Sequence, residues 1–153
     1  MAILHFCRRF IPMSYQIIWY PKGAIKRFSG RVSGSDIYHS VVDMHRDPEF
    51  DSIRYVINDF LAAESLSFAG FDIHEVAAID QAASASNPNI LIAVVASKRE
   101  IIDLAREYVE SPLCFYPTEI FPDMATAERW LVKSLRERFN LEIALPARAM
   151  EAL

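Results

Sequence analysis

The apolar residues of this chain follow two patterns: continuous or alternating runs, which are typical of strands, and helical spacing, which is typical of amphipathic helices. The two patterns alternate along the chain and predict strands followed by helices. Residues 53–61 and 90–96 are apolar runs rich in β-branched side chains, which is typical of strands covered on both faces. Two shorter runs, residues 15–20 and 24–32, flank a proline-lysine-glycine turn and predict a hairpin. Because the run at 24–32 has no cleanly apolar face, we expect it at an edge of the sheet.

Helical spacing follows the hairpin and each later strand. The segment Ser33-Gly34-Ser35-Asp36 supplies good N-cap residues, Asp123 is another, and Ser97 with Glu100 forms a capping box. Residues 62–70 show neither the strand pattern nor the helical spacing and are expected to form a loop. A short last strand is expected from Cys114 to Tyr116, continuing toward Phe121. The helices are expected at residues 33–47, 71–85, 97–111 and 123–135.

The predicted order of elements is therefore β-β-α-β-α-β-α-β-α. Strands that alternate with helices imply right-handed crossovers, so we expect an α/β fold with a mixed central sheet flanked by helices. A length of 153 residues suits one domain, in which roughly two thirds of the surface of the unfolded chain is buried. We expect this domain at residues 13–139, a poorly ordered extension at 1–12 and a C-terminal tail at 140–153.

Charge and composition narrow the choice of partners. The chain has 16 basic and 20 acidic side chains, a net charge of −4 and no lysine-arginine stripe, so we expect no nucleic-acid partner. No apolar run approaches the ~18 residues that a membrane span needs, and we expect no integral membrane segment. The N-terminal residues lack the pattern of an export signal, which favours a cytoplasmic location. Cys7 and Cys114 have neither metal-site nor disulfide spacing, and Cys114 is expected to be a buried thiol.

The motifs of common catalytic sites are missing from the sequence. It contains no nucleotide-binding glycine loop and no nucleophile elbow, and His74-Glu75 lacks the second histidine of a zinc protease. Asp36, His39 and Asp43 share one face of the first predicted helix, where a solvated polar surface is favoured over a metal site. We therefore expect no catalytic residues, no metal and no cofactor, and we expect that the protein is not an enzyme.

Several fragments, taken with the order of elements, resemble one known family. The chain resembles the SpoIIAA-like branch of the STAS fold over residues 14–135, on the fragments GAIKRFSGRVSGSD, YVINDF, NILIAVVAS and IFPDMATAERWL. The resemblance implies a non-enzymatic cytoplasmic regulatory or interaction module that acts through contacts with a protein partner. In anti-sigma-factor antagonists of this fold, a serine at the start of the helix after the central strand is phosphorylated.

The corresponding region here begins at Asp59. Ser65 and Ser67 are its serines, but the family's Asp-Ser-Ser-Gly pattern is absent, so both phosphorylation and ordinary loop hydrogen bonds stay open as their role. Asp59 follows a central strand, where open α/β sheets place functional groups. The expected interaction or ligand surface consists of Asp59, Phe60, Ser65, Ser67, Phe68 and Phe71.

The resemblance also implies an alternative function. The SpoIIAA-like fold is likened to lipid-binding CRAL-TRIO domains, so the chain is alternatively a carrier or sensor of a small apolar, lipid-like ligand. The cavity is then expected between the sheet and the helix that begins near Phe71. A homodimer also stays open, because Trp19 and Tyr20 lie on the predicted hairpin and can pack across a twofold axis.

Overall fold

The computed structural model describes residues 14–145. They form a five-stranded sheet in the order β1-β2-β3-β4-β5, in which only the β1–β2 pair is antiparallel. The strands are β1 (Tyr15–Tyr20), β2 (Gly23–Ser33), β3 (Tyr55–Ser67), β4 (Leu91–Val95) and β5 (Thr118–Phe121). The predicted mixed α/β architecture and its order of elements are confirmed.

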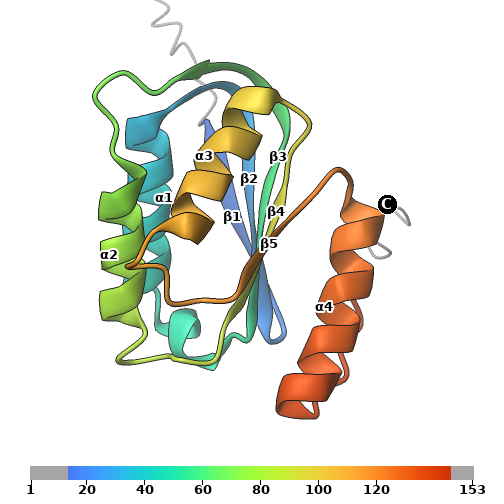
Figure 1. Ribbon diagram of the computed structural model, residues 1–153. Coiled ribbons are helices and arrows are strands. Elements are labelled where there is room, and N and C mark those ends of the chain that lie inside the picture. Colours follow the sequence, from blue (N-terminus) through green and yellow to red (C-terminus); the bar gives the residue numbers. More distant parts are fainter. Residues whose placement is uncertain (1–13, 146–153) are drawn as a thin grey trace, which may run out of the picture.

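The helices form a layer on each face of the sheet (Figure 1). One face is covered by α1 (Gly34–Arg46), α2 (Ile73–Ala83) and α3 (Arg99–Glu110), and the other face is covered by α4 (Met124–Phe139). A short 3-10 helix, η1 (Pro48–Ser52), leads from α1 into β3. No helix in residues 14–145 combines the length and the apolar character that crossing a bilayer requires.

The two strands that the sequence predicts to be covered on both faces, β3 and β4, lie side by side. Tyr55 to Asp59 of β3 pair with Leu91 to Val95 of β4, and alternate side chains enter two separate cores. The core under α4 includes Leu131 and Leu135, which are fully buried. Because both faces are covered, these strands read as continuous apolar runs in the sequence.

The helix caps confirm two predictions and correct one. Ser33 Oγ accepts a hydrogen bond from the Asp36 backbone N–H at 3.1 Å, and Asp123 Oδ1 accepts one from the Thr126 N–H at 2.8 Å. The predicted capping box at Ser97 is wrong, because α3 begins at Arg99 and its N-cap, Lys98, makes no side-chain cap hydrogen bond. The chain stays extended after β4, where the Ala96 N–H donates to the Phe121 carbonyl, so the helix starts later.

Three strand predictions are also corrected. β2 is not an edge strand, because it lies between β1 and β3 and is covered by helices on both faces. Residues 62–67 are not a loop, because they pair with the second half of β2 and extend β3. The last strand begins at Thr118, and the predicted stretch Cys114–Tyr116 is part of the connection, where the Tyr116 hydroxyl donates to the Asn87 carbonyl.

The predicted domain limits remain predictions. The proposed extension at residues 1–12, Cys7 and the last part of the tail lie outside the described residues. Within the described part of the tail, Leu141, Ile143 and Leu145 pack against the core under α4. Cys114 is a partly buried free thiol, and burial raises its pKa.

Candidate functional site

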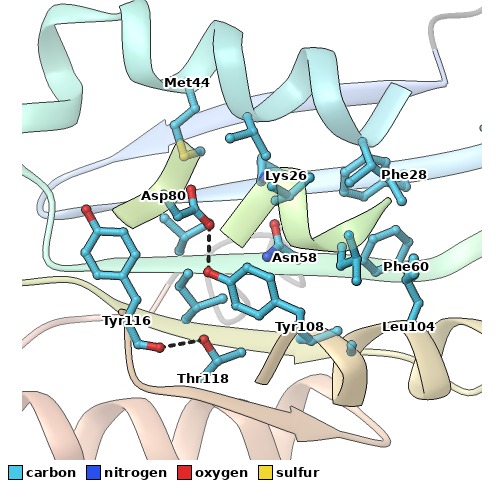
Figure 2. Close-up of a pocket in the computed structure, with 18 of the residues that line it drawn as sticks. Lys26, Phe28, Met44, Asn58, Phe60, Asp80, Leu104, Tyr108, Tyr116 and Thr118 are labelled. Atoms are coloured by element: carbon cyan, nitrogen blue, oxygen red, sulfur yellow. Dashed lines mark hydrogen bonds between the residues drawn. The ribbon is translucent and has the colours of Figure 1, made fainter. Parts of the chain in front are cut away.

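A cavity of about 80 Å³ lies between the sheet and the layer formed by α1, α2 and α3 (Figure 2). Its walls are mostly apolar side chains from the strands and from all three helices. Phe28 of β2 and Phe60 of β3 close one end, with their rings stacked at a centroid distance of 4.3 Å and an angle of 4°. Leu104 of α3 lies beside this aromatic pair in Figure 2.

Two polar residues interrupt the apolar surface that the sheet presents to the cavity. Lys26 of β2 and Asn58 of β3 are register partners, so their side chains lie next to each other on the same face of the sheet. Lys26 is only 6% exposed, and its Nζ lies 3.3 Å from the Ser40 hydroxyl. Asn58 Oδ1 is buried and has no hydrogen-bond partner among the described residues.

Burial changes the acid-base chemistry of Lys26. Loss of solvation lowers the pKa of this amine to about 8, and the negative field of Asp80 opposes the shift. Since this value still lies above neutral pH, Lys26 is mostly a cation there. Among residues 14–145 no aspartate or glutamate forms an ion pair with Lys26.

A second polar group faces the cavity from the helix layer. Asp80 of α2 is 8% exposed, and its two oxygens already have partners. Oδ1 lies 3.1 Å from His45 Nε2 of α1, and Oδ2 accepts a 2.7 Å hydrogen bond from the Tyr108 hydroxyl of α3. Desolvation and the nearby Asp80 carboxylate raise the pKa of Tyr108, so this hydroxyl stays a donor. The three helices are therefore tied together at one carboxylate.

The second candidate region is the far end of β2 and β3. We call residues 29–33 of β2 and 60–67 of β3 the β2–β3 arm. β4 pairs with β3 only as far as Asp59, so within the described chain residues 60–67 have a strand partner on one edge and none on the other. Two register shifts interrupt the pairing of the arm, and in Figure 1 it curves over the top of the helix layer. Leu61, at the start of the arm, is 43% exposed.

The residues predicted as one surface lie in different places. Asp59 lies on the α4 side of the sheet, where it is buried, and its Oδ2 is 3.4 Å from Arg27 Nε. Its Oδ1 accepts a hydrogen bond from the Leu61 N–H at 3.0 Å. Phe60 is on the opposite face and forms part of the cavity wall. Asp59 lies within β3 and not at its C-terminal end.

The other four predicted residues lie on or beside the arm. Ser65 and Ser67 are exposed on the arm itself. Phe68 and Phe71 follow in the turn before α2, are partly buried against the helix-side core, and have ring centroids 6.2 Å apart. The structure therefore brings Ser65, Ser67, Phe68 and Phe71 into one region of the molecule.

Sequence reasoning missed the polar residues of the cavity. Lys26, Asn58, Asp80 and Tyr108 sit at inward positions of their elements and line the cavity. One signal was available: Asp80 follows Ile73, Val76 and Ala77 at helical spacing, which places a carboxylate on the buried side of α2.

The side chains considered for metal binding are separate. Asp36 caps α1, the Asp43 carboxylate accepts a hydrogen bond from Tyr15, and His39 contacts Ser35. In the described part of the chain, no three histidine, cysteine, aspartate or glutamate side chains gather in a way that could hold a metal ion.

The class defined by these observations is a single mixed α/β sheet with three helices on one face and one on the other. The chain is similar in fold to the phosphorylated form of the Bacillus cell fate determinant SpoIIAA. The two share 11% identity with a TM-score of 0.46, over 76% of this chain and 98% of SpoIIAA. No family model matches the chain, and neither does any curated protein.

Proposed function

We propose that this chain is a non-enzymatic regulatory or interaction module that binds a protein partner through the β2–β3 arm. The observation that carries the proposal is the open edge of residues 60–67, which leaves backbone N–H and C=O groups available to an added strand. An extended segment of a partner can pair there by main-chain hydrogen bonds. A cytoplasmic location and a homodimer remain predictions.

Side chains next to this edge also support the binding of a partner strand. Leu61 offers an exposed apolar contact at the start of the arm, while its own N–H is already bonded to Asp59. The inner side of the arm is fixed, because Val32, Ala63 and Leu66 pack against the helix-side core. A partner strand therefore meets a preformed edge and loses little affinity to ordering it.

The test compares two substitutions of equally exposed apolar residues. Leu61→Asp places a charge on the arm, and Val109→Asp places the same charge on the exposed side of α3. Cross-linking in a cell extract is followed by identification of captured proteins, and hydrogen exchange then measures the amides of residues 60–67. We expect one partner that is captured by the wild type and by Val109→Asp, is lost with Leu61→Asp, and slows exchange in the arm.

Capture that is unaffected by Leu61→Asp would overturn the proposal, as would a bound partner that leaves exchange in the arm unchanged. Ser67→Asp gives a finer test, since a negative charge at this exposed position of the arm must be desolvated on binding. We expect it to weaken capture without changing the melting temperature.

A second candidate function is favoured by the cavity. A concave space with apolar walls and a few polar groups is the usual form of a small-molecule site. Its volume of about 80 Å³ is below the roughly 150 Å³ of an engineered cavity that holds benzene, so it suits a small ligand better than a lipid.

A further inference from the structure

Lys26 places a positive charge where the fold gives it little compensation. A cation in an apolar interior is costly unless an anion or several hydrogen bonds accompany it. The ammonium has three N–H donors, and its one hydrogen bond in the described structure goes to Ser40. The nearest acidic group of the cavity, Asp80, is occupied on both oxygens by His45 and Tyr108.

A neighbouring polar group is also incomplete. Asn58 is the register partner of Lys26, and its buried Oδ1 has no partner among the described residues. As it stands this oxygen is an acceptor, but a flip of the amide puts the Nδ2 group, with its two N–H donors, in its place. Two adjacent strands therefore supply unused hydrogen-bonding capacity at one point of an otherwise apolar surface.

We infer that the cavity binds a small monocarboxylate, whose carboxylate accepts hydrogen bonds from Lys26 Nζ and from the Asn58 amide. The apolar end of the ligand lies toward Phe28, Phe60 and Leu104, which form the apolar end of the cavity. This inference rests on the second candidate function and is independent of the β2–β3 arm.

The size of the cavity sets the size of the ligand. The cavity of about 80 Å³ is about half the size of an engineered cavity of roughly 150 Å³ that holds benzene, so it suits a ligand of a few non-hydrogen atoms. A short carboxylate such as acetate or propionate matches this volume, and a longer acyl chain does not. Asn58, Leu104 and Thr118 are partly exposed, which gives the cavity contact with solvent on their side.

The charge of the site sets the ligand's chemical class. A hydrogen bond between ionised partners is about twice as strong as one between neutral groups. Propionate and propanamide have nearly the same shape but differ in charge. The site should therefore prefer the carboxylate, whereas an apolar cavity without a functional cation should not.

The experiment is an NMR titration of the full chain with sodium propionate, propanamide or sodium chloride at matched ionic strength. The signals followed are the methyl groups of Val56, Val94 and Leu104, which line the cavity. We expect saturable shifts with propionate, binding of propanamide weaker by roughly tenfold or more, and no saturable shift with chloride. Lys26→Met should weaken propionate to the level of propanamide, and Lys98→Met, at an exposed lysine, should not change it.

Two results would overturn the inference, and they have different meanings. Equal binding of propanamide and propionate would overturn the inferred preference for a carboxylate, but it would still support the cavity as a small-molecule site. An absence of saturable shifts with either compound would overturn both the carboxylate inference and the second candidate function. The comparison of the two ligands uses the wild-type protein, so it does not depend on the folding of any variant.

Discussion

The two faces of the sheet are built from the same strands, but they enclose different interiors. The face under α4 buries an apolar cluster, and its packing is so close at one point that the Tyr55 ring occupies the space a Cβ would need at Gly23. The face under α1, α2 and α3, the cavity face, encloses a cavity together with Lys26 and Asp80.

The α4 side also buries a charge, Asp59, but its Oδ2 lies 3.4 Å from Arg27 Nε, whereas Lys26 forms no ion pair within residues 14–145. A buried charge without an ion pair costs stability. The two faces therefore differ in that only the face under α1, α2 and α3 combines a cavity with a buried amine that has no ion pair among the described residues.

The largest expected effect comes from removing a core side chain on the face under α4. Leu131 is 0% exposed, and Leu131→Ala should lower the free energy of unfolding by about 3–4 kcal/mol. Leu104→Ala is the matched change on the cavity face and should cost less than half of this, because Leu104 is partly exposed beside an existing cavity. Denaturant titration of both variants measures the difference. Equal losses of unfolding free energy in the two variants would contradict the difference between the two faces.

A gain in stability is expected when the buried charge is removed. Lys26→Met should raise the free energy of unfolding at neutral pH by about 2–3 kcal/mol, since the pKa of Lys26 falls from 10.5 to about 8 on folding. The unfolded chain holds the proton more tightly, so the penalty is fully present below pH 8. It decreases as the pH rises from 8 to 10.5, and the advantage of the variant should vanish over that range.

The comparison of wild type and variant isolates this group. The other titratable side chains facing the cavity are His45 from α1, Asp80 from α2, Tyr108 from α3 and Tyr116 from the segment before β5. They are present in both proteins, so their contributions largely cancel in the difference. Unfolding curves that show no advantage for Lys26→Met at pH 7 would mean that the amine is not desolvated.

A smaller loss is expected at the carboxylate that joins the three helices. Tyr108→Phe removes the hydroxyl that donates to Asp80 and leaves one buried oxygen without this donor. Such an unsatisfied group costs about 1–2 kcal/mol. Tyr38→Phe, at an exposed position of α1, is the control and should change stability by less than about 0.5 kcal/mol. A melting temperature for Tyr108→Phe as high as that of the control would contradict the claim that the Asp80 carboxylate stabilises the packing of the three helices.

The smallest effect separates two helix starts on the cavity face. Ser33→Ala removes the side-chain cap of α1 and should cost about 1 kcal/mol. Ser97→Ala should cost only a few tenths, because α3 begins at Arg99 and Ser97 is outside it. Equal effects in thermal unfolding would show that Ser97 does cap α3.

The architecture could be predicted because its signals are local. Residues 53–60 and 90–96 are apolar and β-branched, which requires cover on both faces, and Ser33 and Asp123 mark helix starts by chemistry within four residues. The arm could not be predicted in this way. Residues 62–67 contain alanine, serine and glutamate, which have low strand propensity, and they are held in a strand by pairing with β2.

The cavity was harder to predict than the strands around it. Neither face of residues 24–32 is cleanly apolar, since Lys26 interrupts one and Arg27 the other, and this pattern predicts an edge strand. In the structure Lys26 extends from the sheet to Ser40 of α1, and the position of the cavity depends on how α1, α2 and α3 meet above the strand. That arrangement is set by contacts between distant segments and leaves no local pattern in the sequence.

The central claim is that the cavity face encloses a charged amine, and NMR titration of the Lys26 side chain tests it most directly. Isotopic labelling of lysine at Cε and Nζ follows this group beside the three exposed lysines, Lys22, Lys98 and Lys133, which serve as internal references. The account predicts a titration midpoint for Lys26 near pH 8. A midpoint near its ordinary value of 10.5 would show that the amine is in water, and would contradict the claim.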